Sequence, residues 1–138
     1  MRFAARVRNS NGEHHADVSV GEKSTSISIA PRPSDFGSSV SGGELLLLAL
    51  ATCYCNDVYR EAAKMNIEVT AVEVECSAEF PAEGAPGKDI RYSARITARA
   101  PEGEIQKLAN VTDGLAEIQN TVRVAIPVRL THVEAITT

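Results

Sequence analysis

The sequence lacks a basic patch, an apolar leader and a long hydrophobic run, and each absence argues against a class of protein. Lysine and arginine number 14 against 18 aspartate and glutamate, a net charge of −4, and the basic residues are scattered. Nucleic-acid binding needs clustered positive charge, so we expect no nucleic-acid partner. The opening segment, MRFAARVRNS, has no apolar stretch of the signal-peptide type, so we expect no export signal.

Cysteine is scarce and odd in number. The three cysteines are Cys53, Cys55 and Cys76, which cannot all be paired within one chain. Unpaired thiols are typical of proteins in reducing compartments. Together with a length of 138 residues, this predicts a single cytoplasmic domain over residues 1–138.

The most apolar segment, residues 41–66, is predicted to form one long helix. Ser41 and Glu44 have the S-x-x-E spacing of a capping box. Residues 45–51, LLLLALA, have no polar side, and a helix that is apolar all round is buried. The apolar run 45–55 is shorter than the roughly 20 residues of a membrane span, so we expect no membrane partner. We expect a core helix instead, covered partly by a second subunit. A solvated face is expected only further on, at Asn56, Asp57, Arg60, Glu61 and Lys64.

Strands are predicted on both sides of this helix from alternating apolar and polar residues. Before the helix, the ranges 2–8, 16–20 and 24–29 suggest three antiparallel strands, followed by a loop rich in Pro, Gly and Ser over 30–43. After it, residues 70–80 and 90–100 form the clearest pair, one with an acidic and the other with a basic outer face. The expected hairpin register places Glu79 opposite Arg91 and Glu75 opposite Arg95.

The C-terminal third is predicted to contain a second helix and a last strand. Apolar spacing indicates a helix over 102–119, and Pro127 marks the entry to a strand over 128–136. The predicted order of elements is therefore antiparallel strands, a Gly/Ser loop, a long helix, a charged hairpin, a second helix and a final strand.

The sequence contains no recognisable metal-binding motif. Cys53 and Cys55 form a C-x-C pair, and on a helix two such residues point about 200° apart. Zinc sites use wider cysteine spacings with further ligands, which do not follow here. The histidines have no catalytic spacing to a cysteine, serine or aspartate; they are His14, His15 and His132. A free cysteine most often packs as a small apolar residue, which is the expectation for Cys55 and Cys76.

The helix start, ELLLLALATC, and the order of elements along nearly the whole chain resemble the family of osmotically inducible protein C and organic hydroperoxide resistance proteins. That family's pattern at this point is E-E-L-L-x-A-A-L-A-x-C. The resemblance implies an OsmC-like α+β fold with antiparallel sheets wrapped around a long central helix in an intertwined homodimer. It also implies thiol-dependent reduction of hydroperoxides without a cofactor.

Carried over by position, the family's site is only partly present. Cys53 falls on the peroxidatic cysteine, and Arg32 lies about one residue from the activating arginine. Gly43 replaces a glutamate at the helix start. The resolving cysteine would fall at Gln119 or Asn120, and neither is a thiol. The disulfide step of the family's cycle is therefore not expected.

Two functions remain open from the sequence. One is a one-cysteine hydroperoxide reductase, in which Cys53 becomes a sulfenic acid and an external thiol reduces it. The other is a non-catalytic dimeric protein that binds a small apolar ligand at the dimer interface. An arginine close to Cys53 would favour the reductase, because burial alone would raise the pKa of Cys53 and leave the thiol unreactive.

Overall fold

The chain divides into two compact units in a computed structural model that describes residues 1–33 and 36–138. The first unit covers residues 1–46 and the second residues 47–138. Helix α1, Gly42–Lys64, starts in the first unit and continues through the second. The expectation of one domain over the whole chain stays a prediction. Among the described residues, no helix is both long and apolar enough to cross a membrane.

The first unit is a three-stranded antiparallel sheet, as the alternation predicted. Its strands are β1 (Phe3–Ser10), β2 (Glu13–Val20) and β3 (Lys23–Ile27), in the order β1-β2-β3. Gly12 has a φ of +77° in the tight turn between β1 and β2, a conformation that glycine adopts without strain. The predicted loop 30–43 follows, apart from positions 34–35, which lie outside the described residues.

The capping box at the start of α1 is confirmed. The Ser41 backbone N–H donates to Glu44 Oε2 at 2.7 Å, and the Glu44 N–H donates to Ser41 Oγ at 3.2 Å. The apolar run that follows is not buried all round by its own chain. Leu50 is 2% exposed, whereas Leu48 is 60% exposed. Cover from a second subunit stays a prediction.

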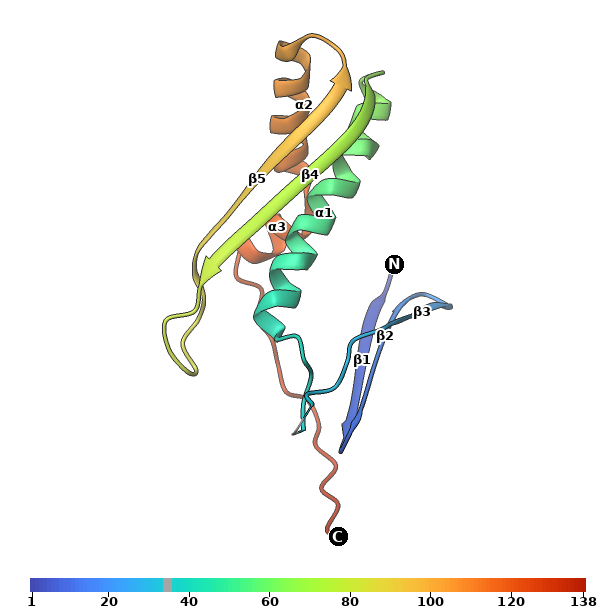
Figure 1. Ribbon diagram of the computed structural model, residues 1–138, viewed down its shortest axis with the longest axis vertical. Coiled ribbons are helices and arrows are strands. Elements are labelled where there is room, and N and C mark those ends of the chain that lie inside the picture. The colour runs from blue at the N-terminus through green and yellow to red at the C-terminus, as the bar shows by residue number, and fades with distance from the viewer. Residues whose placement is uncertain (34–35) are drawn as a thin grey trace. The chain divides into compact units, whose positions relative to one another are not determined.

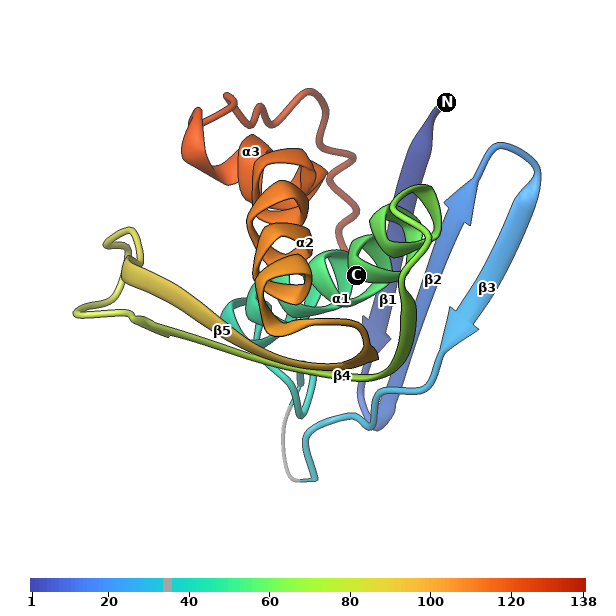
Figure 2. The ribbon, with the colours of Figure 1, turned by 90° about the horizontal axis from the view of Figure 1, so that it is seen from above.

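The second unit packs helices onto one face of a long β-hairpin. Strands β4 (Glu68–Glu79) and β5 (Lys88–Arg99) form the hairpin, and α1 and α2 (Glu102–Leu115) lie on the same face of it (Figures 1 and 2). Alternate β4 and β5 side chains point into the core between these layers. The buried core consists of Tyr54, Val58, Ala62, Ile67 and Leu108. Each fully buried Val or Leu side chain contributes roughly 1.5–3 kcal/mol to folding.

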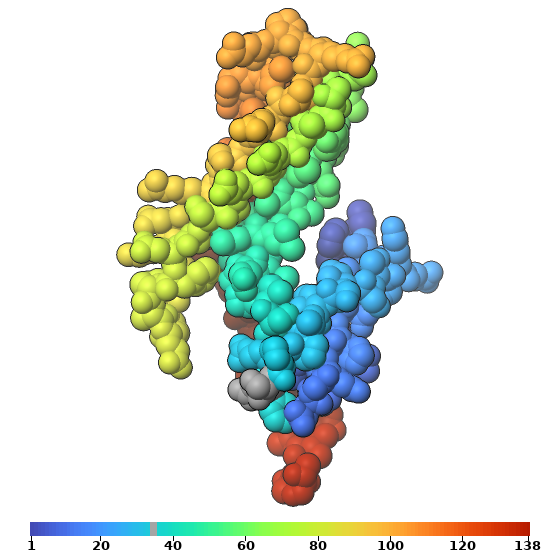
Figure 3. All heavy atoms as spheres, in the orientation of Figure 1, coloured from blue at the N-terminus to red at the C-terminus, as the bar shows by residue number. Residues whose placement is uncertain are grey.

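The predicted hairpin is confirmed, but its predicted register is wrong by two residues. Glu75 lies opposite Ser93, and Glu73 lies opposite Arg95. A bulge between Ser77 and Glu79 shifts the pairing again, so that Glu79 pairs with Lys88. In the turn that follows, the Phe80 ring lies over Gly87, where a Cβ would lie 2.8 Å from Cε1. Between Ala71 and Ser77 the shift is two residues, which keeps the side chains of this stretch on their expected faces. Figure 3 shows the hairpin as one band that runs from its turn to α2.

The predicted second helix is broken into two. Ala116, fully buried, has extended backbone (φ −68°, ψ 110°) and separates α2 from α3, Glu117–Arg123. The predicted strand over 128–136 is wrong for the isolated chain, where the described residues 126–138 have no regular structure. A strand needs a neighbour for its backbone hydrogen bonds. Val128 and Leu130 are instead 98% and 85% exposed.

Candidate functional site

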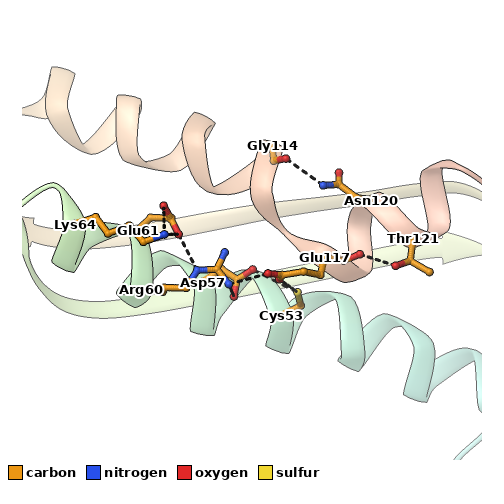
Figure 4. Close-up of polar contacts among 9 residues, drawn as sticks. All are labelled: Cys53, Asp57, Arg60, Glu61, Lys64, Gly114, Glu117, Asn120 and Thr121. Carbon is orange, nitrogen blue, oxygen red and sulfur yellow. Dashed lines mark hydrogen bonds and ion pairs between the residues drawn. The ribbon is translucent and has the colours of Figure 1, made fainter. Parts of the chain in front are cut away.

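A cluster of charged side chains lies where the second half of α1 meets α3. We call it the charged cluster; its members are Asp57, Arg60, Glu61, Lys64 and Glu117 (Figure 4). The sequence predicted that the α1 members face solvent, and this was wrong for two of them. Asp57 is 7% and Glu61 is 3% exposed. Helical periodicity missed this because it does not show the ion pairs that Arg60 makes with both carboxylates and with Glu117, which starts the unpredicted helix α3.

Arg60 holds the charged cluster together. Its Nε donates to Glu61 Oε2 at 2.7 Å, and its Nη1 lies 3.0 Å from Asp57 Oδ1 and 2.9 Å from Glu117 Oε1. Lys64 Nζ supplies a second cation to Glu61 Oε2 at 3.0 Å. Three carboxylates thus face two cations, which leaves the cluster one negative charge in excess.

The Cys53 thiol sits beside the two carboxylates that Arg60 bridges. Its Sγ lies 3.6 Å from Asp57 Oδ2 and 3.8 Å from Glu117 Oε2. Cys53 and Asp57 are four residues apart, so they share one face of α1. Glu117 is the first residue of α3. The thiol has a single proton, so it can donate to only one of these oxygens at a time.

This environment keeps Cys53 protonated near neutral pH. Burial raises the pKa of the thiol above its ordinary value, and the negative charges of Asp57 and Glu117 raise it further, against an opposing hydrogen bond from the Ile118 backbone. The pKa of Asp57 is also raised, first by burial and then by Glu117. The more exposed Glu117 has a lowered pKa, first through its own backbone N–H and then through Asp57 and Arg60. Asp57 is therefore the better proton acceptor of the two.

The second predicted site residue, Arg32, belongs to the first unit, while Cys53 belongs to the second. The Arg32 backbone N–H donates to the Gly37 carbonyl at 3.0 Å. Its guanidinium packs over Gly37, where a Cβ would lie 3.5 Å from Arg32 Cζ. Activation of Cys53 by Arg32 stays a prediction.

Both residues at the expected resolving position have structural hydrogen bonds. Gln119 is 3% exposed, and its Nε2 donates to the Leu50 carbonyl at 2.9 Å. Its Oε1 has no partner among the described residues. Gln119 also lines a cavity of about 110 Å³ together with Leu50, Ile90, Tyr92, Val122 and Arg123. Asn120 Nδ2 donates to the Gly114 carbonyl at 3.1 Å (Figure 4).

The other two cysteines are free and half-buried. Burial raises the pKa of Cys76, which lies on β4. Asp57 and Glu117 are the site residues that sequence reasoning missed. The C-x3-D spacing of Cys53 and Asp57 could have indicated their contact, whereas no sequence signal placed Glu117 beside them.

The chain belongs to the OsmC-like protein family, whose model matches residues 35–131. No curated protein sequence matches it. Among solved structures, it is similar to an OsmC-like protein from Mycoplasma pneumoniae, with a TM-score of 0.62 and 15% identity over 88% of this chain and 86% of that one.

Two similar structures are described as organic hydroperoxide resistance proteins. The one from Legionella pneumophila has a TM-score of 0.57 and 13% identity, and covers 89% of this chain and 90% of its own. The other, OhrB of Bacillus subtilis, has a TM-score of 0.54 and 16% identity, and covers 89% of this chain and 91% of its own. At these identities the likeness establishes the fold, which is the predicted OsmC-like α+β fold.

Proposed function

We propose that this protein reduces organic hydroperoxides through a single cysteine, Cys53. The observation that carries the proposal is the pairing of the family-position cysteine with a buried carboxylate, Asp57, at 3.6 Å. A cysteine next to a general base is one of the standard arrangements for thiol nucleophiles. Family membership and the names of the similar structures supply the substrate class.

In the proposed reaction, the Cys53 sulfur attacks the terminal oxygen of ROOH as its proton passes to Asp57. The O–O bond breaks, the S–O bond forms, and Asp57 returns the proton to the departing alkoxide. The balance is Cys–SH + ROOH → Cys–SOH + ROH, with sulfur oxidised and the peroxide reduced. Arg60 keeps the carboxylates in place by binding the oxygens that face away from sulfur.

An external thiol then reduces the sulfenic acid, because Gln119 and Asn120 cannot attack it as a cysteine would. The external thiol forms a mixed disulfide with Cys53 and releases water. A second thiol releases the Cys53 thiol, leaving a disulfide of the external reductant. We place this reaction in the cytoplasm, where such thiols are abundant.

We also propose that the working form is a homodimer. Support comes from the apolar surface that one chain leaves exposed on α1 and on the C-terminal segment, including Leu48, Val128 and Leu130. Exposed apolar patches of this kind typically mark an interface. A partner strand edge would also provide the backbone hydrogen bonds that residues 128–136 lack.

The second candidate is a non-catalytic dimeric protein that binds a small apolar ligand. Two observations favour it: the raised pKa of Cys53, and the mostly apolar 110 Å³ cavity beside Gln119. In this case the unpaired Gln119 Oε1 would accept a hydrogen bond from one N–H or O–H group on an otherwise apolar ligand. Ligand binding would then be independent of Cys53.

A peroxide-consumption assay separates the two candidates. The chelator-treated protein is mixed with cumene hydroperoxide and either a dithiol or a monothiol, and loss of peroxide is followed. We expect turnover that Cys53→Ser abolishes and that Cys55→Ser, the matched control on the same helix, preserves. Equal peroxide loss with wild-type protein and Cys53→Ser would reject catalysis by Cys53 and favour the binding protein.

A further inference from the structure

The side chains around Cys53 also have the arrangement of a metal centre. We propose that Cys53, Asp57 and Glu117 bind one divalent transition-metal ion of the zinc type. The three potential ligand atoms, one sulfur and two carboxylate oxygens, all lie within 4.8 Å of one another. They come from two helices, α1 and α3, of the same compact unit.

The separations fit a tetrahedral ion. Zinc binds thiolate sulfur at about 2.3 Å and carboxylate oxygen at about 2.0–2.2 Å, so a tetrahedral angle places these two atoms about 3.5–3.7 Å apart. The observed distances from Cys53 Sγ are 3.6 Å to Asp57 Oδ2 and 3.8 Å to Glu117 Oε2. An ion between them would need only small side-chain movements.

Arg60 orients the carboxylates for such an ion instead of competing for the same atoms. Its Nη1 contacts Asp57 Oδ1 and Glu117 Oε1, which leaves Oδ2 and Oε2 facing sulfur (Figure 4). The charges also balance. A thiolate and two carboxylates carry −3, which Arg60 and a divalent ion neutralise. Hydrogen-bonded outer residues of this kind are typical of metal sites.

The donor set selects the class of ion. A thiolate sulfur with carboxylate oxygens suits Zn²⁺ and Co²⁺, whereas Mg²⁺ and Ca²⁺ take oxygen ligands only. Three protein ligands leave a fourth position for water, and the Glu117 side chain, 63% exposed, lies on the solvent side. Binding replaces the thiol proton by the metal and releases it to solvent: Cys–SH + M²⁺ → Cys–S–M⁺ + H⁺.

This inference goes beyond the proposed peroxide chemistry. An ion on Cys53 would occupy the sulfur lone pair that attacks the peroxide, so metal binding would inhibit the reaction reversibly. The two proposals fail separately, because peroxide consumption is measured on chelator-treated protein and metal binding is measured without peroxide.

Cobalt is the most informative probe. Co²⁺ added to the chelator-treated full chain should give a thiolate-to-cobalt charge-transfer band and tetrahedral d–d bands that saturate at one ion per chain. Cys53→Ser should remove the charge-transfer band, while Cys55→Ser should keep it. Glu117→Gln changes an exposed position, so the fold should tolerate it. It should weaken Co²⁺ binding at least about tenfold, since losing a residue that only supports a metal ligand often has that effect. No charge-transfer band in the wild-type protein, or an unchanged band in Cys53→Ser, would overturn the proposal.

A second measurement uses only the wild-type protein, so misfolding of a variant cannot affect its result. Alkylation of Cys53 by iodoacetamide is followed by mass spectrometry with and without Zn²⁺, with Cys76 as the internal reference. We expect Zn²⁺ to slow the labelling of Cys53 at least tenfold and to leave Cys76 unchanged. Equal labelling of Cys53 with and without Zn²⁺ would refute the site.

Discussion

Neutralising Glu117 should make Cys53 more reactive. The Glu117 carboxylate lies 3.8 Å from the Cys53 sulfur, and its side chain is 63% exposed, so solvent screens the interaction strongly. With a water-like dielectric, Coulomb's law gives about 1 kcal/mol at that distance. Removing the charge should therefore lower the pKa of the thiol, and about 1 kcal/mol corresponds to a roughly sixfold rise in the thiolate fraction near neutral pH.

The assay is iodoacetamide labelling of Glu117→Gln in a Cys55→Ser/Cys76→Ser background with chelator present. The labelling rate at pH 7 should rise about sixfold over the same background with Glu117 intact. In both proteins the rate should increase toward alkaline pH, because the pKa of Cys53 is raised. The matched control is Glu73→Gln, on the outer face of β4 opposite Arg95, which should change nothing. An unchanged or slower rate in Glu117→Gln would refute the electrostatic reading of the site.

Three further predictions concern stability and assembly. Leu108→Ala, at a fully buried core position, should lower the free energy of unfolding by about 2–5 kcal/mol in urea denaturation, and no measurable loss would contradict the described core. Light scattering at micromolar concentration should give about twice the 14.7 kDa chain mass, and a stable monomer would refute the dimer. At pH values between the ordinary thiol pKa and the raised pKa of folded Cys53, the Cys53 thiol is ionised in the unfolded chain but not in the folded one. Wild-type protein should therefore lose more stability with rising pH than Cys53→Ser.

The fold was largely predictable because its elements are encoded locally. The capping residues Ser41 and Glu44 and the alternation in β4 and β5 each identify an element within a short window. The hairpin register was less predictable, since the bulges between Val69 and Ala71 and between Ser77 and Glu79 do not show in the alternation. The break at Ala116 left no such local signal. The strand over 128–136 was predicted from alternation alone, and alternation does not provide the neighbour that a strand requires.

The site was predictable only as far as family resemblance extended. Cys53 was found by its place in the helix pattern, and its surroundings were not. Asp57 and Glu61 look like solvated residues in the sequence, whereas in the structure both are buried and form ion pairs with Arg60. Contacts between residues 64 positions apart, such as Cys53 and Glu117, follow from tertiary packing.

The most direct test of Cys53 as the sole peroxidatic residue is mass spectrometry after one equivalent of cumene hydroperoxide in the presence of dimedone. We predict a dimedone adduct on Cys53, and sulfinic acid on the same residue when oxidant is in excess and dimedone is left out. Cys55 and Cys76 should remain unmodified. A disulfide joining Cys53 to Cys55 or Cys76, or a Cys53 that no hydroperoxide oxidises, would contradict the account.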